Sequence, residues 1–245
     1  MTTKTAICAV EWGAGRAELT ELRMADGEDD VPAVLEVLRS SDWAAIDAPF
    51  GWPTEFVKWI RTYADTAKPS DVHPAMWRLR HTDRLVAREL RNHPLSVSSD
   101  RIGSTARHVA GILARVSEDG RVDRFGDSTR IVEAYPAATL SSFHLAHDRY
   151  KGKIGTAWKR RGAILSGLIE LTEGRLEIAD RDRELLQSSD DMLDALVCAI
   201  TARVAALALD RKPSDDEEKQ FAASEGWIRF PGVDMKVAEL FRNRP

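Results

Sequence analysis

Acidic residues stand where apolar segments of this chain end. Asp47 closes the run "WAAID" just before the Pro- and Gly-rich "APFGWP", and Glu133 closes the run "RIVE" just before "AYP". Short apolar runs bounded by Gly and Pro are typical of buried strands. An acid at the end of such a strand contributes little to packing, so these positions favour a role in binding or catalysis.

Two further apolar segments carry acids in comparable places. Glu11 ends the N-terminal run "TAICAVE". Asp191 and Asp194 lie near the start of "DDMLDALVCAITARVAALAL", the clearest helical segment of the chain, and their spacing places them on one helix face. Ligands of open α/β sheets gather beyond the carboxyl ends of the strands. We therefore expect these acids to face one crevice.

Such a group of carboxylates suits divalent metal chemistry. Crowded carboxylates repel one another unless a cation lies among them. Hard oxygen ligands without a His–Cys cluster favour Mg²⁺ or Mn²⁺ over zinc. Two ions about 3.5–4 Å apart can activate a water molecule and stabilise the leaving oxygen in phosphodiester hydrolysis. The sequence predicts as metal ligands Glu11, Asp47, Asp191 and Asp194, and as catalytic residues these four together with Glu133.

Each acid also has a structural explanation that the sequence leaves open. Asp191 and its neighbour Asp190 suit the first turn of a helix, where an acid favours the positive end of the helix dipole. Asp194 precedes a nearly unbroken apolar run and needs a cation, either a metal or a fixed Arg or Lys side chain such as an arginine of the insertion. Asp47 could cap the turn that follows it, and Glu11 suits the exposed end of a hairpin.

Candidate substrate-binding residues lie beside these acids or in basic segments. Trp12 follows the first acid and could stack on a base. Arg84 and Arg88 share a helix face in "TDRLVAREL", where they could contact phosphates or form internal ion pairs. Lys151 belongs to the basic segment "RYKGKIGTAWKRR", for which a solvated helix face is the alternative explanation.

The pattern along the chain predicts a single α/β domain over residues 1–245. Residues 5–24 are typical of a β-hairpin, and 29–41 of a helix with Asp30 at its cap. The strand ending at Asp47 follows, and this order predicts parallel pairing. Residues 54–120 are helical in pattern but interrupted by prolines, which predicts a largely helical insertion. The remaining predicted elements are a strand within 128–140, helices at 156–171 and 188–209, and a short strand at 225–231.

Composition indicates a globular protein of a reducing compartment. Hydrophobic residues make up 43% and charged residues 30% of the chain, which is ordinary for such proteins. The net charge of −4 argues against a generally basic surface, although a local basic groove is compatible with it. Cys8 and Cys198 lie far apart without metal-ligand spacing, as free thiols do. We recognise neither a secretory signal nor an apolar window of membrane-spanning length, and we expect a cytoplasmic location without a membrane partner.

Five segments carry a family resemblance: "AIDAPFGWP", "TDRLVAREL", "VEAYPAATL", "DDMLDALVCAITA" and "EGWIRFP". Together they resemble the Domain of Unknown Function 429 family, described as predicted nucleases of ribonuclease H-like fold. The matching segments follow one another in the family's order from about residue 5 to residue 231. "DDMLDALVCA" is the most specific of them, and it is also similar to the final-helix motif of Holliday-junction resolvases.

The resemblance implies a ribonuclease H-like fold, in which helices flank a mixed five-stranded sheet and acids cluster at one sheet edge. It implies a first-strand acid at Glu11, a crossover-strand acid at Asp47 and a later acid at Glu133. The final-helix acids fall on Asp191 and Asp194. Glu11 departs from the pattern, because the superfamily usually has the shorter Asp at this position.

These features predict a metal-dependent nuclease, a hydrolase that acts on phosphodiester bonds of DNA or RNA. One alternative is a catalytically inactive ribonuclease H-like module that binds nucleic acid or a protein, which the longer side chain of Glu11 favours. Another is a phosphotransferase of the actin-like ATPase fold, for which only Gly13 and Gly15 offer a phosphate-binding loop. The sequence does not fix the oligomeric state, and a dimer is one of the states open to it.

Overall fold

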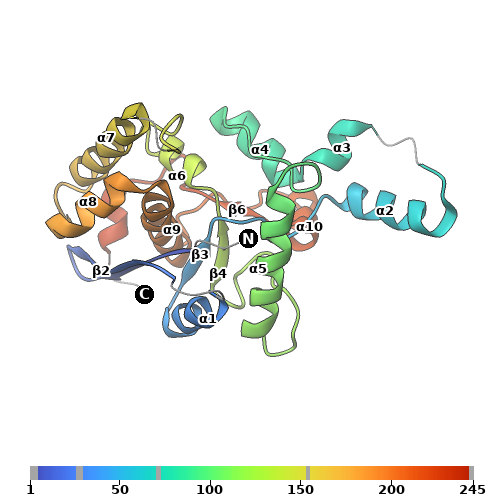
Figure 1. Ribbon diagram of the computed structural model, residues 1–245, viewed down its shortest axis with the longest axis horizontal. Coiled ribbons are helices and arrows are strands. Elements are labelled where there is room, and N and C mark those ends of the chain that lie inside the picture. Colours follow the sequence, from blue (N-terminus) through green and yellow to red (C-terminus); the bar gives the residue numbers. More distant parts are fainter. Residues whose placement is uncertain (1–4, 26–29, 70–72, 153–154, 243–245) are drawn as a thin grey trace. The chain divides into compact units, whose positions relative to one another are not determined.

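The computed structural model describes residues 5–25, 30–69, 73–152 and 155–242. They form an α/β structure (Figure 1). Its elements in chain order are β1 (Ala6–Trp12), β2 (Ala17–Met24), α1 (Val31–Ser40), β3 (Ala44–Ile46), α2 (Thr54–Thr66), α3 (Pro74–Arg78), α4 (His81–Leu90), α5 (Ile102–Val116), β4 (Ile131–Ala134), α6 (Pro136–Ser142), α7 (Gly155–Leu171), β5 (Leu176–Glu177), α8 (Asp180–Ser188), α9 (Asp190–Ala206), α10 (Asp216–Glu225), β6 (Ile228–Arg229) and the 3₁₀ helix η1 (Val237–Phe241).

The strands of the described residues lie in two sheets of three instead of the expected single sheet of five. β1 and β2 form the predicted antiparallel hairpin, and β5 pairs with β2 in parallel. The other sheet has the order β3–β4–β6, so the strand before Asp47 does not pair with the hairpin as we expected. β3, β5 and β6 span only two or three residues each. Ladders this short leave little pattern from which the pairing of a strand can be predicted.

The chain divides into two compact units. The first unit comprises residues 1–47, 134–211 and 229–245, and the second comprises 48–133 and 212–228. The second unit holds the helices α2 to α5 and α10. The boundaries of a single domain with an insertion at about 54–120 stay a prediction.

Helix α9 forms the centre of the first unit. The prediction of a buried helix at 188–209 is confirmed, because its residues from Met192 to Ala205 are almost all buried. Ser189 caps it, and the Ser189 hydroxyl accepts a hydrogen bond from the N–H of Met192 at 3.3 Å. An apolar surface on every side suits a helix covered all round. α9 packs against β1 and β3, and it thereby fixes the position of Asp194 relative to the end of β3.

The other predicted helices are present with small shifts in their ends. The segments predicted at 29–41 and 156–171 form α1 and α7. Asp30 stands at the cap position of α1, but its side chain does not cap the helix and accepts a hydrogen bond from the Thr5 hydroxyl instead. None of the helices in the described ranges is both long and apolar enough to span a membrane.

Candidate functional site

The ammonium group of Lys151 joins two of the predicted acids in the first unit. Its Nζ lies 2.8 Å from Oδ2 of Asp194 and 3.8 Å from Oδ2 of Asp47. The Asp194 side chain is 10% exposed, whereas that of Asp47 is 37% exposed. Two carboxylates from distant segments therefore share one cation at the edge of the buried core. We call Asp47, Lys151 and Asp194 the carboxylate site.

Secondary structure places each member of the carboxylate site. Asp47 directly follows β3, and Asp194 lies in the second turn of α9, which packs on β3. Lys151 lies in the loop between α6 and α7. The buried Arg161 holds this loop, because its guanidinium donates hydrogen bonds to the carbonyls of Tyr150 at 2.6 Å and of Gly152 at 3.0 Å. The residues on both sides of Lys151 are thus fixed.

Tyr150 completes the surroundings of Asp194. Its hydroxyl donates a hydrogen bond to Oδ1 of Asp194 at 2.7 Å, and its ring is buried. Oδ2 of Asp194 faces Lys151, so each oxygen of this buried carboxylate has its own donor. A buried carboxylate needs such partners, since an unpaired one is costly. The orientation of Asp194 is therefore fixed from two directions.

Burial and charge shift the pKa values in the carboxylate site. Burial raises the pKa of Asp194, and the Lys151 ammonium opposes this shift. Burial lowers the pKa of Lys151, but Asp194 and Asp47 outweigh burial and hold the pKa above its ordinary value. The pKa of Tyr150 is raised by burial and then by the negative charge of Asp194. The ammonium is thus held in its charged form, and Tyr150 is held as a neutral donor.

The acids next to Asp194 on α9 have different surroundings. Asp190 accepts a hydrogen bond from the N–H of Gly152 at 3.1 Å, which ties the Lys151 loop to the start of α9. Asp191 is exposed in the first turn of the same helix. Both acids therefore occupy the helix start, as their structural explanation expects, and Asp190 also positions the loop that carries Lys151.

Glu11 lies on the exposed side of the hairpin. It is the residue before the last in β1, and it stands opposite Glu18 of β2 in the antiparallel register. Both side chains are exposed. Two like charges opposite each other do not stabilise a strand pair, and solvent exposure makes them tolerable. Glu11 thus occupies the kind of hairpin end that its structural explanation expects.

Glu133 belongs to the second unit and is fully engaged there. Its carboxylate accepts two hydrogen bonds from the Arg80 guanidinium, both at 2.7 Å, and one from the N–H of Phe50 at 2.9 Å. Arg80 also pairs with Asp83 at 2.8 Å, and all three charged side chains are at most 3% exposed. Burial raises the pKa of Glu133, although Arg80 opposes the shift. The described geometry gives Glu133 the contacts of a buried structural ion pair.

The other predicted substrate-binding residues contact residues outside the carboxylate site. The ring of Trp12 packs against Phe241, with 5.8 Å between ring centroids, and the Arg203 guanidinium lies over the same indole ring, 5.4 Å from its centroid. Arg84 donates a hydrogen bond to the carbonyl of Leu79 at 2.6 Å. Arg88 is 67% exposed on α4 and lies 3.9 Å from Glu89.

The carboxylate site fits one divalent ion by its chemistry. Mg²⁺ is commonly held by one or two protein carboxylates, with waters and substrate phosphates completing its coordination. Asp47 and Asp194 provide two hard-oxygen donors, and the Lys151 ammonium marks a position between them that attracts a cation. Within the described ranges, no group of three or more His, Cys, Asp or Glu side chains could hold a metal ion. The full ligand set of Glu11, Asp47, Asp191 and Asp194 stays a prediction.

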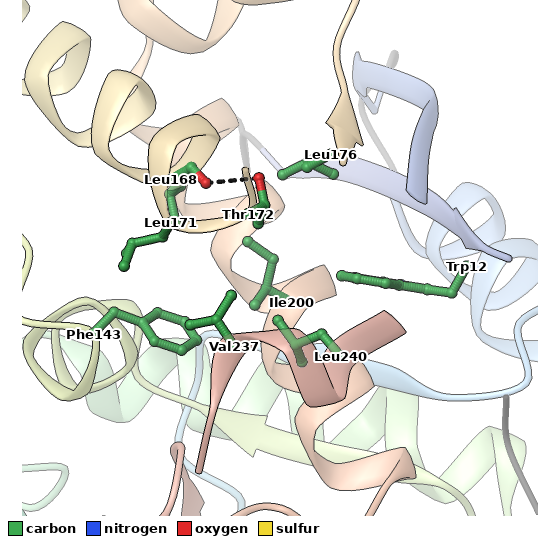
Figure 2. Close-up of a pocket in the computed structure, with 9 residues that line it drawn as sticks. All are labelled: Trp12, Phe143, Leu168, Leu171, Thr172, Leu176, Ile200, Val237 and Leu240. Atoms are coloured by element: carbon green, nitrogen blue, oxygen red, sulfur yellow. Dashed lines mark hydrogen bonds between the residues drawn. The ribbon is translucent and has the colours of Figure 1, made fainter. Parts of the chain in front are cut away.

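A small apolar cavity elsewhere in the first unit has no part in this chemistry. Figure 2 shows its lining, in which Trp12 and Ile200 face Val237 and Leu240. The lining contains no charged side chain, and the hydroxyl of Thr172 is already bonded to the carbonyl of Leu168 at 2.9 Å. Its open space of about 10 Å³ is close to the room of a single water molecule. The cavity is therefore a packing defect of the core.

Comparisons with known proteins connect the chain to a family. The family model described as "Protein of unknown function (DUF429)" matches residues 2–218. The chain belongs to this family. The match spans Asp47, Lys151 and Asp194, so the carboxylate site lies within the part of the chain that defines membership of DUF429. Searches of curated proteins and of solved structures found no match.

Proposed function

We propose that this protein is a divalent-metal-dependent nuclease of ribonuclease H-like type, in which Asp47 and Asp194 hold one Mg²⁺ or Mn²⁺ ion. The observation that carries the proposal is the shared contact of both carboxylates with the Lys151 ammonium, at 3.8 and 2.8 Å. Carboxylates far apart in the sequence converge here because β3 and α9 pack together. Such convergence is what a bound cation requires.

The bound ion would stabilise negative charge on a phosphate oxygen and lower the pKa of a water molecule. The protein's own side chains do the positioning. Tyr150 orients Asp194, and Arg161 holds the loop that carries Lys151. The Lys151 side chain is 55% exposed, so its ammonium can leave the carboxylates and contact a phosphate of the nucleic acid.

A cleavage assay tests this function. Labelled single-stranded, double-stranded and branched DNA and RNA are incubated with the protein in Mg²⁺, Mn²⁺ or EDTA. We expect metal-dependent cleavage of at least one substrate. Asp47→Asn and Asp194→Asn should each lower the rate by at least about 10- to 100-fold, the loss produced even by removing the outer partners of a metal ligand.

The matched control is Asp216→Asn, which changes a 99% exposed carboxylate on α10 and should leave the rate unchanged. Thermal unfolding of each variant without metal shows whether the fold is kept. We expect Asp47→Asn to unfold close to the wild-type temperature, because the pair that it loses with Lys151 is long, at 3.8 Å, and partly exposed, and such pairs contribute at most about 1 kcal/mol. Full activity in both site variants would exclude the proposal.

The second candidate function is a catalytically inactive module that binds nucleic acid. The longer side chain of Glu11, where the superfamily that the chain resembles usually has Asp, favours it, because Mg²⁺ tolerates shifts of its ligands poorly. A gel-shift experiment with the same substrates separates the two functions. Retarded but intact nucleic acid in both Mg²⁺ and Mn²⁺ identifies the binding module. A cytoplasmic location stays a prediction under either function.

A further inference from the structure

A groove lies between α7 and α8. The two helices pack against each other in the first unit, and Figure 1 shows them side by side. The groove has a volume of about 380 Å³, which lies in the range of small-molecule sites, about 300–1,000 Å³. Among the described residues, its lining includes Trp158, Lys159, Gly162, Ser166, Arg183 and Gln187.

Gly162 shapes the floor of the groove. A Cβ atom at this position would lie 2.5 Å from Nε2 of Gln187 and 3.1 Å from its side-chain carbonyl carbon. The absence of a side chain on α7 therefore lets the Gln187 amide of α8 lie across this helix. Trp158 and Ser166 flank Gly162 at one-turn spacing on α7. An indole, an amide and a hydroxyl thus follow one another along the groove.

The polar groups of the groove have unused hydrogen-bonding capacity. Arg183 donates through Nε to the carbonyl of Ile178 at 3.0 Å, which fixes the side chain and leaves its terminal nitrogens available. Considering only the described residues, neither Arg183 nor Lys159 forms an ion pair, and the side-chain amide of Gln187 makes no hydrogen bond. The lining carries two positive charges and no carboxylate. Its chemistry is that of a donor-rich anion site.

Trp158 adds an apolar surface to this site. Its side chain is 50% exposed, although Trp usually buries most of its area. An exposed indole beside Lys and Arg provides the combination with which proteins bind single-stranded nucleic acid. The ring stacks on a base, while the cations contact the phosphate. The amide of Gln187 can pair with a base edge, since it offers both a donor and an acceptor.

We propose that the α7–α8 groove binds a nucleoside phosphate, with Trp158 stacked on the base and with Lys159 and Arg183 on the phosphate. The shared chemistry is that of a free mononucleotide or of one unit in a single-stranded nucleic acid. The proposal goes beyond the metal-dependent function, because none of the groove's residues belongs to the carboxylate site. Binding here needs no divalent ion.

Fluorescence anisotropy in EDTA tests the groove without any contribution from cleavage. The probe is a short labelled single-stranded oligonucleotide, and adenosine monophosphate serves as competitor. We expect Trp158→Ala to weaken binding about 10-fold, as loss of a base stack does. Trp158→Phe should keep most of the affinity, because a phenyl ring also stacks. The double variant of Lys159→Ala with Arg183→Ala should lower the slope of log affinity against log salt by about 0.7 to 1.4, since one or two phosphate contacts with a single strand are lost.

Matched controls lie in the second unit. Tyr63→Ala removes a ring that is 49% exposed, and Arg121→Ala removes a side chain that is 88% exposed. Both should leave binding unchanged. If adenosine monophosphate displaces the oligonucleotide, a free nucleotide is a sufficient ligand of the groove. If it does not, the ligand is a nucleotide within a single strand. Equal affinities of wild type and Trp158→Ala, or no binding of either probe, would overturn the proposal whatever the cleavage assay gives.

Discussion

Lys151 places its ammonium 2.8 Å from the carboxylate of Asp194, at the position where the sequence predicted a metal ion beside this acid. The sequence left two kinds of partner open for Asp194, a metal or a fixed Arg or Lys side chain. In this structure the partner is a lysine of the α6–α7 loop. This lysine was itself a predicted substrate-binding residue. A predicted metal ligand and a predicted substrate-binding residue thus form one ion pair.

The first prediction concerns the stability of a Lys151→Ala variant. We expect the free energy of unfolding at pH 7 to fall by about 1–3 kcal/mol. Asp194 is almost buried and Lys151 is half exposed, so the cost lies between that of an exposed pair and that of breaking a buried one. Urea unfolding of the variant and of Lys58→Ala, which removes a 72% exposed side chain, measures it.

The pH dependence of this loss has a definite sign. The pKa of Asp194 is raised in the folded protein, and removal of Lys151 raises it further. The folded variant therefore binds a proton that the unfolded chain does not bind, between about pH 3.9 and the raised pKa. Its stability falls as the pH rises through this window. A loss that is as large at pH 3 as at pH 7 would contradict the assigned ion pair.

The second prediction concerns the hydrogen bond between Tyr150 and Asp194. Tyr150→Phe keeps the buried ring but removes the donor to Oδ1 of Asp194. We expect the free energy of unfolding to fall by about 1.5–3 kcal/mol, the range for hydrogen bonds to charged groups. Thermal or urea unfolding at pH 7 measures it. Unchanged stability would mean that water replaces the hydroxyl and that Tyr150 does not position Asp194.

The third prediction separates a structural Glu133 from a catalytic one. Glu133→Gln breaks the buried ion pair with Arg80. We therefore expect the free energy of unfolding to fall by about 3–5 kcal/mol and the Mn²⁺ affinity to stay unchanged. Glu173→Gln, which changes a 78% exposed carboxylate, is the control for stability. A variant of wild-type stability that binds Mn²⁺ less tightly would return Glu133 to the predicted set of catalytic acids.

Much of the local secondary structure could be predicted because it depends on the pattern of neighbouring residues. The apolar surface of α9 and the hairpin at the N-terminus are examples. The pairing of β3 could not be predicted, since a strand of three residues carries almost no register information. Acids at the end of a strand or near the start of a helix selected Asp47 and Asp194, which the structure brings to one lysine. The same rule also selected Glu133, whose partner Arg80 is 53 residues away in the chain.

The contacts by which Tyr150 and Arg161 support the carboxylate site could not be predicted, for a physical reason. Tyr150 acts through one hydroxyl, and Arg161 acts through backbone carbonyls on either side of Lys151. Neither role leaves a spacing pattern in the sequence. The only signal was the position of Tyr150 beside a lysine in a basic segment, which indicates a loop but no contact with Asp194.

The most direct test of the central claim is a calorimetric titration of Mn²⁺ into the wild type, Asp47→Asn, Asp194→Asn and Lys151→Met. If the two carboxylates form one cation site that Lys151 fills in the metal-free protein, either Asn variant weakens Mn²⁺ binding by about 10-fold or more. Lys151→Met then strengthens it by about 5-fold, the equivalent of about 1 kcal/mol of lost competition. Equal Mn²⁺ affinities in all four proteins would contradict the claim.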